Sequence, residues 1–294
     1  MDYFPLLVDE AGAMITDVIQ KFVDQEIMPI RDKIDDDVDH VLINQLLIKM
    51  SALGVFNVDL PEEGAETAGP SFPNACAVIE EFSRGDAGIG LVAGISSWAM
   101  AGAIYGRNRE VIDLYHRMQQ EKQPTFACFA MTEPESGCDV ENLPAMHGRT
   151  IKTRARQDGD EWVVNGAKRF PSNAGISSLY CVVCQTDPEQ GEDGIAMIYV
   201  PEDAEGLRFG KFEVKAGLQS DRNCDIFFDD VRVPLSYRAA GPGDDTVVLG
   251  RNVSTGRVVS AAAAVGCARG AFEECLKYTG DRVVGGKPVR DHSI

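Results

Sequence analysis

Positive charge is scarce in this sequence of 294 residues. Its 28 lysine and arginine side chains stand against 46 aspartate and glutamate side chains, which gives a formal net charge of −18 at pH 7. An acidic surface repels phosphate backbones and anionic lipid headgroups. We therefore expect neither nucleic acid nor an anionic membrane as a partner. An anionic cofactor stays possible, because backbone N–H groups and single arginines can bind one locally.

Long apolar runs and targeting signals are missing as well. We find no apolar run that approaches the roughly 20 residues needed to span a bilayer, so we expect no membrane insertion. The first residues, MDYFPLLVDEAG, have the features of neither a signal peptide nor an arginine-rich transit peptide. These observations favour a cytoplasmic protein.

Cysteine is present, but not in the spacing of a disulfide framework. Eight cysteines are scattered along the chain. Cys181 and Cys184 form a CxxC pair inside an apolar run that is expected to be a strand. Residues three apart on a strand point to opposite faces, so we expect no metal or redox site there. Reduced thiols fit a cytoplasmic location.

The first part of the chain carries the spacing of helices. Apolar side chains recur every three to four residues, which is typical of amphipathic helices. Pro29 should kink or end the first helix, and Gly54 should stop the second. The acidic run Asp35–Asp37 is expected at a solvated helix start. The pattern predicts an all-helical N-terminal domain, residues 1–122, with helices near 14–30, 42–53, 75–82, 89–104 and 109–118.

In residues 123–238 the apolar period changes from 3.6 to two, as in strands. Asp158-Gly159-Asp160 supplies a hairpin turn, and Asn165-Gly166 is expected to make another turn. Short strands at this spacing predict a middle β-barrel or sandwich domain. The expected strands cover residues 150–156, 162–164, 178–184, 195–200, 207–214 and 224–233.

Residues 239–294 begin another helical part. An apolar face runs from Val258 to Leu276, and small residues between Ala261 and Gly270 make the helix slim enough for another helix to approach closely. A long helix of this kind needs packing partners, so we expect a homo- or hetero-oligomer that covers it. The predicted fold class is therefore α+β, with a helical domain, a β domain and the long helix of an incomplete C-terminal bundle.

One stretch joins the helical and strand-forming parts, TFACFAMTEPESGCD at Thr125–Asp139. An apolar run breaks at Thr132-Glu133-Pro134 and opens into a loop of small and polar residues. Such a loop presents backbone N–H groups, which favour anions or carbonyl oxygens. Its spacing alone favours an ordinary strand-to-turn junction.

Four blocks of the chain, in the right order, resemble the acyl-CoA dehydrogenase family. The resemblance covers nearly the whole chain and is strong as a set, although each motif alone is weak. The blocks are the N-terminal helices from Leu53-Gly54 to Ser83-Arg84, the middle-domain flavin segments Phe129–Asp139 and Asn165–Asn173, the strand end Asp229–Pro234, and the slim-helix block from Arg257 to Val289.

This resemblance implies an FAD-dependent enzyme that oxidises an acyl-CoA thioester between Cα and Cβ. Phe170 would form the apolar wall of the flavin ring, Ser172 would bond its N5 atom, and Thr132 would face its pyrimidine edge. Arg282 would reach the flavin of a neighbouring subunit. The cofactor-binding residues so implied are Phe129, Met131, Thr132, Gly137, Cys138, Phe170, Ser172 and Arg282, and the substrate-binding residues are Cys138, Ser254 and Arg257.

Taken singly, these residues have plainer interpretations. Phe170 fits a core aromatic, Ser172 a turn residue and Arg282 a solvated helix charge. The sequence also departs from the family pattern: Cys138 replaces a serine, Phe170 a tryptophan and Ser254 an acid, Gly285 replaces an aromatic, and Gln219-Ser220-Asp221 replaces an arginine and small residues.

The catalytic base is the main missing part. Dehydrogenation needs a carboxylate to remove the α-proton. Most of the family carries this glutamate in the C-terminal helical domain. A minority carries it just before the arginine of the slim helix, where this chain has Gly256. We identify no catalytic residue in this chain and expect a C-terminal bundle, or a partner subunit, to supply one.

The implied partners are an acyl-CoA substrate and an electron-transfer flavoprotein as electron acceptor. Two alternatives remain open. The chain could be a non-catalytic subunit of a heteromeric dehydrogenase, or a flavin oxidase or monooxygenase on the same fold. Flavin content after purification separates the first alternative from a dehydrogenase, and oxygen reactivity of the reduced flavin separates the second.

Overall fold

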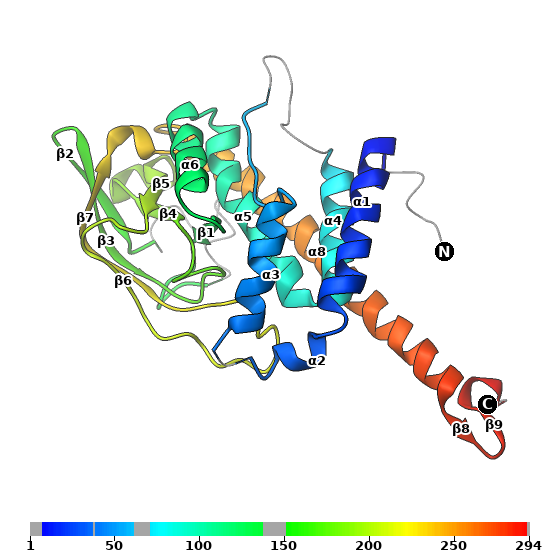
Figure 1. Cartoon of the computed structure of the whole chain (residues 1–294). Helices are drawn as coiled ribbons and strands as arrows, with labels where there is room; N and C mark the ends of the chain where they lie inside the picture. The colour runs from blue at the N-terminus through cyan, green and yellow to red at the C-terminus, as the bar shows by residue number, and fades with distance from the viewer. Residues whose placement is uncertain (1–7, 38, 62–70, 138–150, 293–294) are drawn as a thin grey trace.

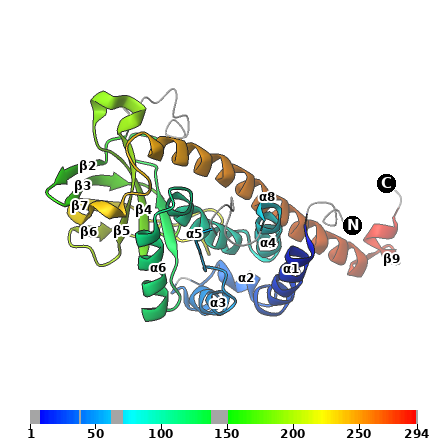
Figure 2. The same cartoon turned by 90° about the horizontal axis from the view of Figure 1, so that it is seen from above.

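The computed structural model describes residues 8–37, 39–61, 71–137 and 151–292. Helices pack beside a curled sheet, and one long helix crosses the helical part and extends beyond it (Figures 1 and 2). This arrangement confirms the predicted α+β class.

The helices before the sheet are α1 (Glu10–Phe22), the π-helical turn η2 (Val23–Ile27), α2 (Arg31–Ile34), α3 (Val41–Ala52), α4 (Phe72–Gly85), α5 (Ala87–Tyr105) and α6 (Arg109–Glu121). The strands are β1 (Ala127–Ala130), β2 (Arg154–Asp158), β3 (Glu161–Lys168), β4 (Leu179–Gln185), β5 (Ile195–Pro201), β6 (Leu207–Phe209) and β7 (Ile226–Pro234), and the chain continues through α8 (Asp244–Asp281) to the short hairpin β8 (Val283–Val284) and β9 (Lys287–Pro288).

The first helices end where the sequence places its breakers. The helical run that begins at Glu10 ends at Ile27, two residues before Pro29. The acidic run lies just before α3, which confirms its expected place at a solvated helix start. Asp37 caps α3, because its two carboxylate oxygens accept the N–H groups of Val41 and Ile43 at 3.0 Å each. A negative charge at the start of this helix also complements the helix dipole.

The sheet is mixed and its strand order is β1-β4-β2-β3-β7-β6, with β5 paired to β4 outside this path. β1 and β4 are parallel, whereas the pairs β2–β3, β3–β7, β6–β7 and β4–β5 are antiparallel. Every residue of β4 is buried. This is the pattern of a strand that is covered on both faces, and it places the end of β1 deep in the molecule.

Two details of the strands differ from the expectation. Asn165-Gly166 lies inside β3 rather than in a turn, and the register to β7 shifts between Val164 and Gly166. Gly166 has φ of 143°, and a Cβ there would lie 2.7 Å from the Thr153 Cα, so only glycine fits this bulge. The strand expected over 207–214 ends at Phe209.

The two thiols of the CxxC pair lie on opposite faces of β4, as their strand spacing predicts. Cys181 packs with the core that contains α5 and α6, and Cys184 packs with the core on the other face of the sheet. Burial raises the pKa of the Cys181 thiol and raises that of Cys184 to about 12. Both thiols therefore stay protonated at neutral pH and act as small core side chains.

The expectation that no apolar run reaches the length of a bilayer span was wrong for α5. Its 19 residues have a mean hydropathy of 1.6 and lack charge, which makes it the one helix among the described residues that is long and apolar enough to cross a membrane. However, 61% of it is buried inside the structure. It contacts α4, α6, α8 and β1, which is the environment of a core helix.

The close helix approach that the small residues predict takes place between α8 and α4. α8 has 38 residues, so it is about 57 Å long. A Cβ added at Gly266 would overlap the Glu80 carbonyl oxygen, and one at Gly270 would overlap the Arg84 carbonyl oxygen. The opposite face, with Val265, Phe272 and Leu276, is exposed in this chain. The glycines therefore serve a contact within the chain, and the apolar face is left uncovered.

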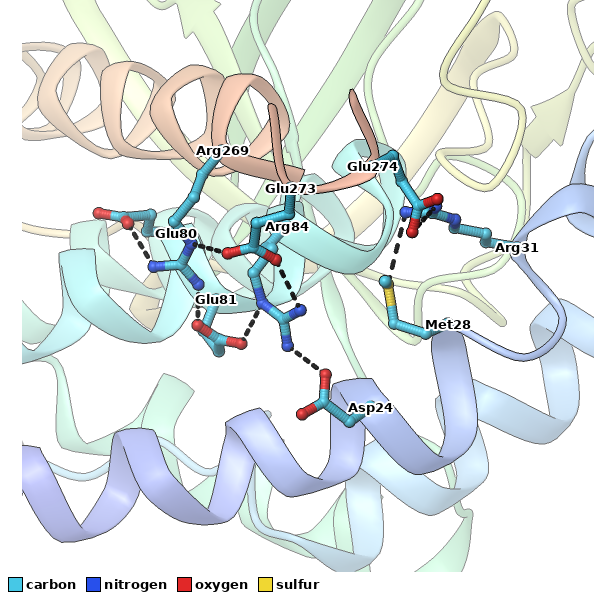
Figure 3. Close-up of polar contacts among 9 residues, drawn as sticks. All are labelled: Asp24, Met28, Arg31, Glu80, Glu81, Arg84, Arg269, Glu273 and Glu274. Carbon is cyan, nitrogen blue, oxygen red and sulfur yellow. Dashed lines mark hydrogen bonds and ion pairs between the residues drawn. The ribbon is translucent and has the colours of Figure 1, made fainter. Parts of the chain in front are cut away.

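Charged side chains complete this contact (Figure 3). The Arg84 side chain is 6% exposed, and its guanidinium donates to Glu81 at 2.6 Å, to Asp24 at 2.5 Å and to Glu273 at 3.2 Å. These acceptors come from α4, η2 and α8. Arg269 adds ion pairs from α8 to Glu80 and Glu81, and a separate pair joins Arg31 to Glu274 at 2.7 Å. The network fixes α8 on α4 over the stretch where the glycines allow contact.

We expect Gly270→Ala to destabilise the chain by about 1–3 kcal/mol, because the new methyl group overlaps backbone that cannot move freely. Gly280→Ala in the last turn of the same helix is the matched control. Its nearest neighbour is the mobile end of Arg290 at 3.0 Å, so we expect no loss and a gain of up to about 1 kcal/mol from helix propensity. Urea unfolding measures both, and equal effects of the two substitutions would contradict the close approach.

Candidate functional site

Three chain segments meet beside the N-terminal end of α5, and we call this place the loop junction. The backbone N–H of Arg169 donates to the Thr132 carbonyl at 2.8 Å, which joins the first segment to the second. An isolated antiparallel bridge between Ser172 and Asn223 joins the second to the third. The junction comprises residues 131–137 after β1, residues 168–173 after β3, and residues 215–223 before β7.

A buried ion pair ties the first two segments together. Lys168 donates from Nζ to Glu133 Oε1 at 2.9 Å, with side chains that are 0% and 1% exposed. Lys168 also donates to the Met131 carbonyl at 2.9 Å. Glu133 accepts the backbone N–H groups of Lys152 at 2.6 Å and Thr153 at 2.8 Å. The pair therefore holds the loop after β1 against both β3 and the segment that enters β2.

The surroundings keep the Glu133 carboxyl ionised. Burial alone would raise its pKa, but the Lys168 charge and the donated hydrogen bonds outweigh this effect, so the pKa of Glu133 is lowered. Burial lowers the pKa of Lys168, while Glu133 opposes this shift. Two fully buried charges that satisfy one another in this way are expensive to separate.

Phe170 presents its ring at the surface of the junction. Its backbone has φ of 54°, a left-handed conformation that is uncommon for a residue with a side chain. The ring is 51% exposed, and the Arg169 guanidinium lies 5.2 Å from its centroid. The plainer interpretation of Phe170 as a core aromatic is therefore wrong, because the ring is half accessible. A strained backbone that holds an apolar ring at the surface points to a ligand contact.

Ser172 lies next to a buried carboxylate. Its hydroxyl donates to Asp221 Oδ2 at 2.8 Å, and it accepts from Asn223 Nδ2 at 3.3 Å. Asn223 Nδ2 also donates to the Phe170 carbonyl at 3.0 Å. Lys215 Nζ lies 3.8 Å from the same Asp221 oxygen and donates to the Asp221 carbonyl. Ser172 is thus part of a polar cluster rather than a simple turn residue.

Two further contacts anchor the third segment. Ser220 donates to Asp86, whose carboxylate also caps α5 by accepting the Ile89 N–H at 2.9 Å. Arg222 donates to Asn44 of α3 at 3.0 Å, and its guanidinium lies 5.7 Å from the centroid of the Phe212 ring. The segment that carries Asp221 is therefore held by two helices as well as by the loop that carries Ser172.

The other expected flavin contacts are distributed around this junction. Phe129 is buried and packs on Trp98 with ring centroids 4.4 Å apart, and Met131 is buried beside it in the core. Thr132 is half-buried and follows directly. A Cβ added at Gly137 would have open space around it. Cys138 lies outside the described residues.

The expected substrate residues lie on α8. Ser254 and Arg257 are exposed on its first half, and the Ser254 hydroxyl donates to the Gly250 carbonyl of its own helix at 2.9 Å. Arg282 is exposed just after the last turn, where its carbonyl accepts the Val289 N–H at 2.9 Å. In Figure 1 this end of α8 extends away from the sheet. Arg282 is therefore far from the junction of its own chain.

Comparison with models of protein families shows to which family this chain belongs. The model described as acyl-CoA dehydrogenase, N-terminal domain, matches residues 9–108, and the model described as acyl-CoA dehydrogenase, middle domain, matches residues 128–231. The two matches follow one another in the family order. The chain belongs to the acyl-CoA dehydrogenase family.

Relatives with assigned names agree with this membership. Cyclohex-1-ene-1-carbonyl-CoA dehydrogenase of Geobacter metallireducens is 33% identical over 212 residues, which is 72% of this chain and 54% of that protein. Mitochondrial short-chain specific acyl-CoA dehydrogenase of Rattus norvegicus is 28% identical over 294 residues, which is 98% of this chain and 67% of that protein. The chain thus spans between about half and two thirds of the length of these two relatives.

A solved structure supports the fold over nearly the whole chain. A structure described as an electron transferring flavoprotein of Acidaminococcus fermentans contains a chain that superimposes with a TM-score of 0.84 at 27% identity, covering 99% of this chain and 73% of that one. The described residues therefore adopt the fold of the family from the first helix to the end of α8.

A narrow crevice between α5 and α8 bears on the position of the base in this family. It has a volume of about 20 Å³ and is lined by residues that include Gly94, Trp98, Gly256 and Val259. A Cβ at Gly256 would lie 2.6 Å from the Trp98 ring. The indole N–H donates to the Asn252 carbonyl at 2.7 Å, which fixes the ring there. In this structure a carboxylate side chain has no room at position 256.

Sequence reasoning missed three residues that matter here. Lys168 lies inside the Asn-Gly-x-Lys motif, but the motif alone indicates no role for it. Asp221 stands out in the sequence only as a departure from the family pattern. Trp98 lies in an apolar helix and gives no signal. No local cue in the sequence reveals the Glu133–Lys168 pair, because the two residues are 35 positions apart and their burial is visible only in the structure.

We expect Glu133→Gln to destabilise the chain by about 3–5 kcal/mol at neutral pH, because it leaves the buried Lys168 charge without its partner. Adding Lys168→Met should recover part of this loss, so the double mutant should be more stable than the sum of the single effects predicts. Asp229→Asn, which removes an exposed partner of Arg208 at 3.5 Å, is the control and should cost less than about 0.5 kcal/mol. Urea unfolding of Glu133→Gln, Lys168→Met, the double mutant and Asp229→Asn measures these changes in the free energy of unfolding.

The same pair gives the chain a defined acid sensitivity. Because the pKa of Glu133 is lowered in the folded chain from an ordinary value of 4.5, its contribution is present above that value and is lost as pH falls through the lowered pKa. The stability difference between the wild type and Glu133→Gln should therefore shrink as the pH is lowered below about 4. A difference that is constant between neutral and strongly acidic pH would contradict an ionised Glu133.

Proposed function

We propose that this chain is the FAD-binding part of an acyl-CoA dehydrogenase that oxidises an acyl-CoA thioester between its α and β carbons. The observation that carries the proposal is the exposed Phe170 ring beside the Ser172 hydroxyl at the loop junction. Family membership supplies the reaction class, and the named relatives act on acyl-CoA thioesters of different acyl groups.

The residues of the junction fit a flavin. A flavin ring needs a flat apolar wall and hydrogen-bond partners along its polar edge. Phe170 offers an aromatic face that is 51% exposed, and Ser172 offers a half-buried hydroxyl. The buried Asp221 oxygen Oδ1 has no hydrogen-bond partner among the described residues, as expected at a place that binds a polar ligand.

When bound, FAD supplies the acceptor for the hydride that leaves the β-carbon of the substrate. The chain's own part is to bind and orient. Glu133 and Lys168 fix the loop that follows β1, Phe170 covers a ring face, and Ser172 holds a hydroxyl at the ring edge. The base for the α-proton comes from a C-terminal helical bundle or a partner subunit, because Trp98 occupies the space beside Gly256.

We further propose that the exposed apolar face of α8 is covered in an oligomer. Val258, Val265, Phe272 and Leu276 are between 49% and 62% exposed, and a continuous apolar stripe of this kind marks a contact surface. Arg282 at the far end of α8 would then contact the junction of the neighbouring copy. An electron-transfer flavoprotein is the proposed electron acceptor, and the similarity to the Acidaminococcus fermentans structure supports this choice.

We expect that the 294-residue chain alone does not reduce its flavin with acyl-CoA. Anaerobic mixing of the FAD-loaded chain with butyryl-CoA should leave the oxidised flavin absorbance unbleached, because Gly256 stands at one of the two family positions of the base. Gly256→Glu should not restore the reaction, since its Cβ meets the Trp98 ring at 2.6 Å, whereas Gly256→Glu combined with Trp98→Ala creates room for the carboxylate. Bleaching by the unmodified chain would show that the base lies elsewhere in it.

A thermal-shift titration with FAD tests the cofactor site. FAD should stabilise the wild type by RT ln(1 + c/Kd), where c is the FAD concentration, so the stabilisation should keep rising with FAD concentration after the site is filled. Phe170→Ala should leave the stability without FAD nearly unchanged, because the ring is half exposed, but should weaken FAD binding by about 2–3 kcal/mol, roughly 30- to 150-fold. Ser172→Ala should cost binding only about 1 kcal/mol and instead shift the flavin reduction potential.

Phe272→Ala is the control, because Phe272 is an aromatic residue on α8 that is 62% exposed. In the monomeric chain it should change neither the affinity for FAD nor the flavin reduction potential. The proposal fails if FAD, up to millimolar concentration, gives no stabilisation of the wild type.

A further inference from the structure

The function proposed above uses Asp221 only as an unpartnered acceptor at the site, yet this carboxylate is bonded directly to the Ser172 hydroxyl, which is proposed to contact the flavin. Asp221 is only 4% exposed to solvent. Oδ2 accepts the Ser172 proton at 2.8 Å, and Oδ1 has no partner among the described residues. A buried carboxylate with half of its acceptor capacity unused costs free energy, so a purely structural residue at this position would be better as a small neutral one.

The direction of the hydrogen bonds around Ser172 is fixed by its neighbours. Asp221 is an acceptor, so the Ser172 hydroxyl proton points towards Oδ2 and away from the solvent side of the junction. Asn223 Nδ2 already donates to Ser172 Oγ at 3.3 Å. The remaining lone pair of Ser172 is therefore suited to accept a proton from a ligand N–H. A reduced flavin carries such a hydrogen on N5, whereas an oxidised flavin does not.

We infer that Ser172 and Asp221 form a proton relay that accepts the N5 proton when the reduced flavin is re-oxidised. The inference rests on the proposed function. A dehydrogenase flavin receives a hydride from its substrate and must lose two electrons and one proton before the next turnover. The electrons go to a one-electron acceptor, two equivalents for each flavin. The N5 proton passes to Ser172 Oγ as the Ser172 hydroxyl proton passes to Asp221 Oδ2, which becomes a carboxylic acid.

The surroundings suit a carboxylate that is protonated and deprotonated in turn. Burial raises the pKa of Asp221, and the opposing effects of Lys215, Ser172 and Asn223 limit this shift. Lys215 Nζ, 3.8 Å from Oδ2, favours the ionised form at rest. Its side chain is 24% exposed, so the proton can leave Asp221 for solvent past this half-buried amine. Asp221 acts through Ser172 and is a positioning and proton-accepting residue, without direct contact with the substrate.

The test uses the full FAD-loaded chain without acyl-CoA, so that it does not depend on the missing base. The flavin is reduced by light under anaerobic conditions, with EDTA as the electron donor, and is then mixed with ferricenium, a one-electron oxidant, in H2O and in D2O. Re-oxidation of the wild type should show a solvent isotope effect. Asp221→Asn and Ser172→Ala should each slow re-oxidation about tenfold or more, because both remove the positioned proton acceptor. Asp221→Glu should restore part of the rate.

A second measurement is independent of rate. The infrared difference spectrum between reduced and freshly re-oxidised protein should contain a carboxylic-acid carbonyl band in the wild type. The band should be absent in Asp221→Asn and retained in Asp229→Asn, the exposed control on β7. If Asp221→Asn fails to fold, Ser172→Ala still tests the relay. It interrupts the relay on the flavin side, so it should also remove the carboxylic-acid band.

The outcomes separate the two proposals. Wild-type rates in folded, FAD-binding Asp221→Asn or Ser172→Ala, or an unchanged carbonyl band in either, overturn the relay and leave the proposed function intact. Absence of FAD-dependent stabilisation in the wild type overturns the proposed function and the relay together. Slower re-oxidation with loss of the band and of the isotope effect supports the relay.

Discussion

The buried pair of Glu133 and Lys168 is the interaction on which the candidate site depends. It joins the loop after β1 to the end of β3, which are 35 residues apart in the chain. Neither charge reaches solvent, so neither side chain can relax to water if the other is lost. A buried ion pair adds little net stability over an apolar pair, but it specifies which segments must meet. Here it specifies that Thr132 lies beside Arg169 and thus fixes the direction in which Phe170 and Ser172 leave β3.

A second constraint acts on the helical side. α4 approaches α8 closely at Gly266 and Gly270, and the arginines on either side of this contact share carboxylates from both helices. Beyond this contact, α8 extends away from the other helices towards the short hairpin of β8 and β9 (Figures 1 and 2). Burial of Arg84 with three acidic partners makes this attachment specific in angle and register, since a shift by one residue would leave a buried guanidinium unpaired.

Much of the fold could be read from the sequence because its signals are local. Helical and strand periods, the proline after η2 and the slim face of α8 are all properties of short windows, and the family resemblance fixed their order. What the sequence could not reveal depends on residues distant in the chain. The bulge at Gly166 looked like a turn because the strand that continues through it is held by β7. α5 was missed as a long apolar helix because serines and glycines interrupt its hydrophobic residues. The exposure of Phe170 and the pairing of Ser172 with Asp221 follow from the meeting of three loops, which no window of sequence contains.

The contact between Trp98 and Gly256 has a consequence for how related chains can vary. The two positions are far apart in the sequence, yet the indole ring occupies the volume that any side chain on α8 would need at that point. A change at one position is therefore tolerated only with a change at the other, and the two should covary among chains that share this arrangement. A chain with an acidic residue at the position of Gly256 would carry a small residue at the position of Trp98. In this chain the indole ring fills that volume, so α8 contributes packing and no side chain at this point.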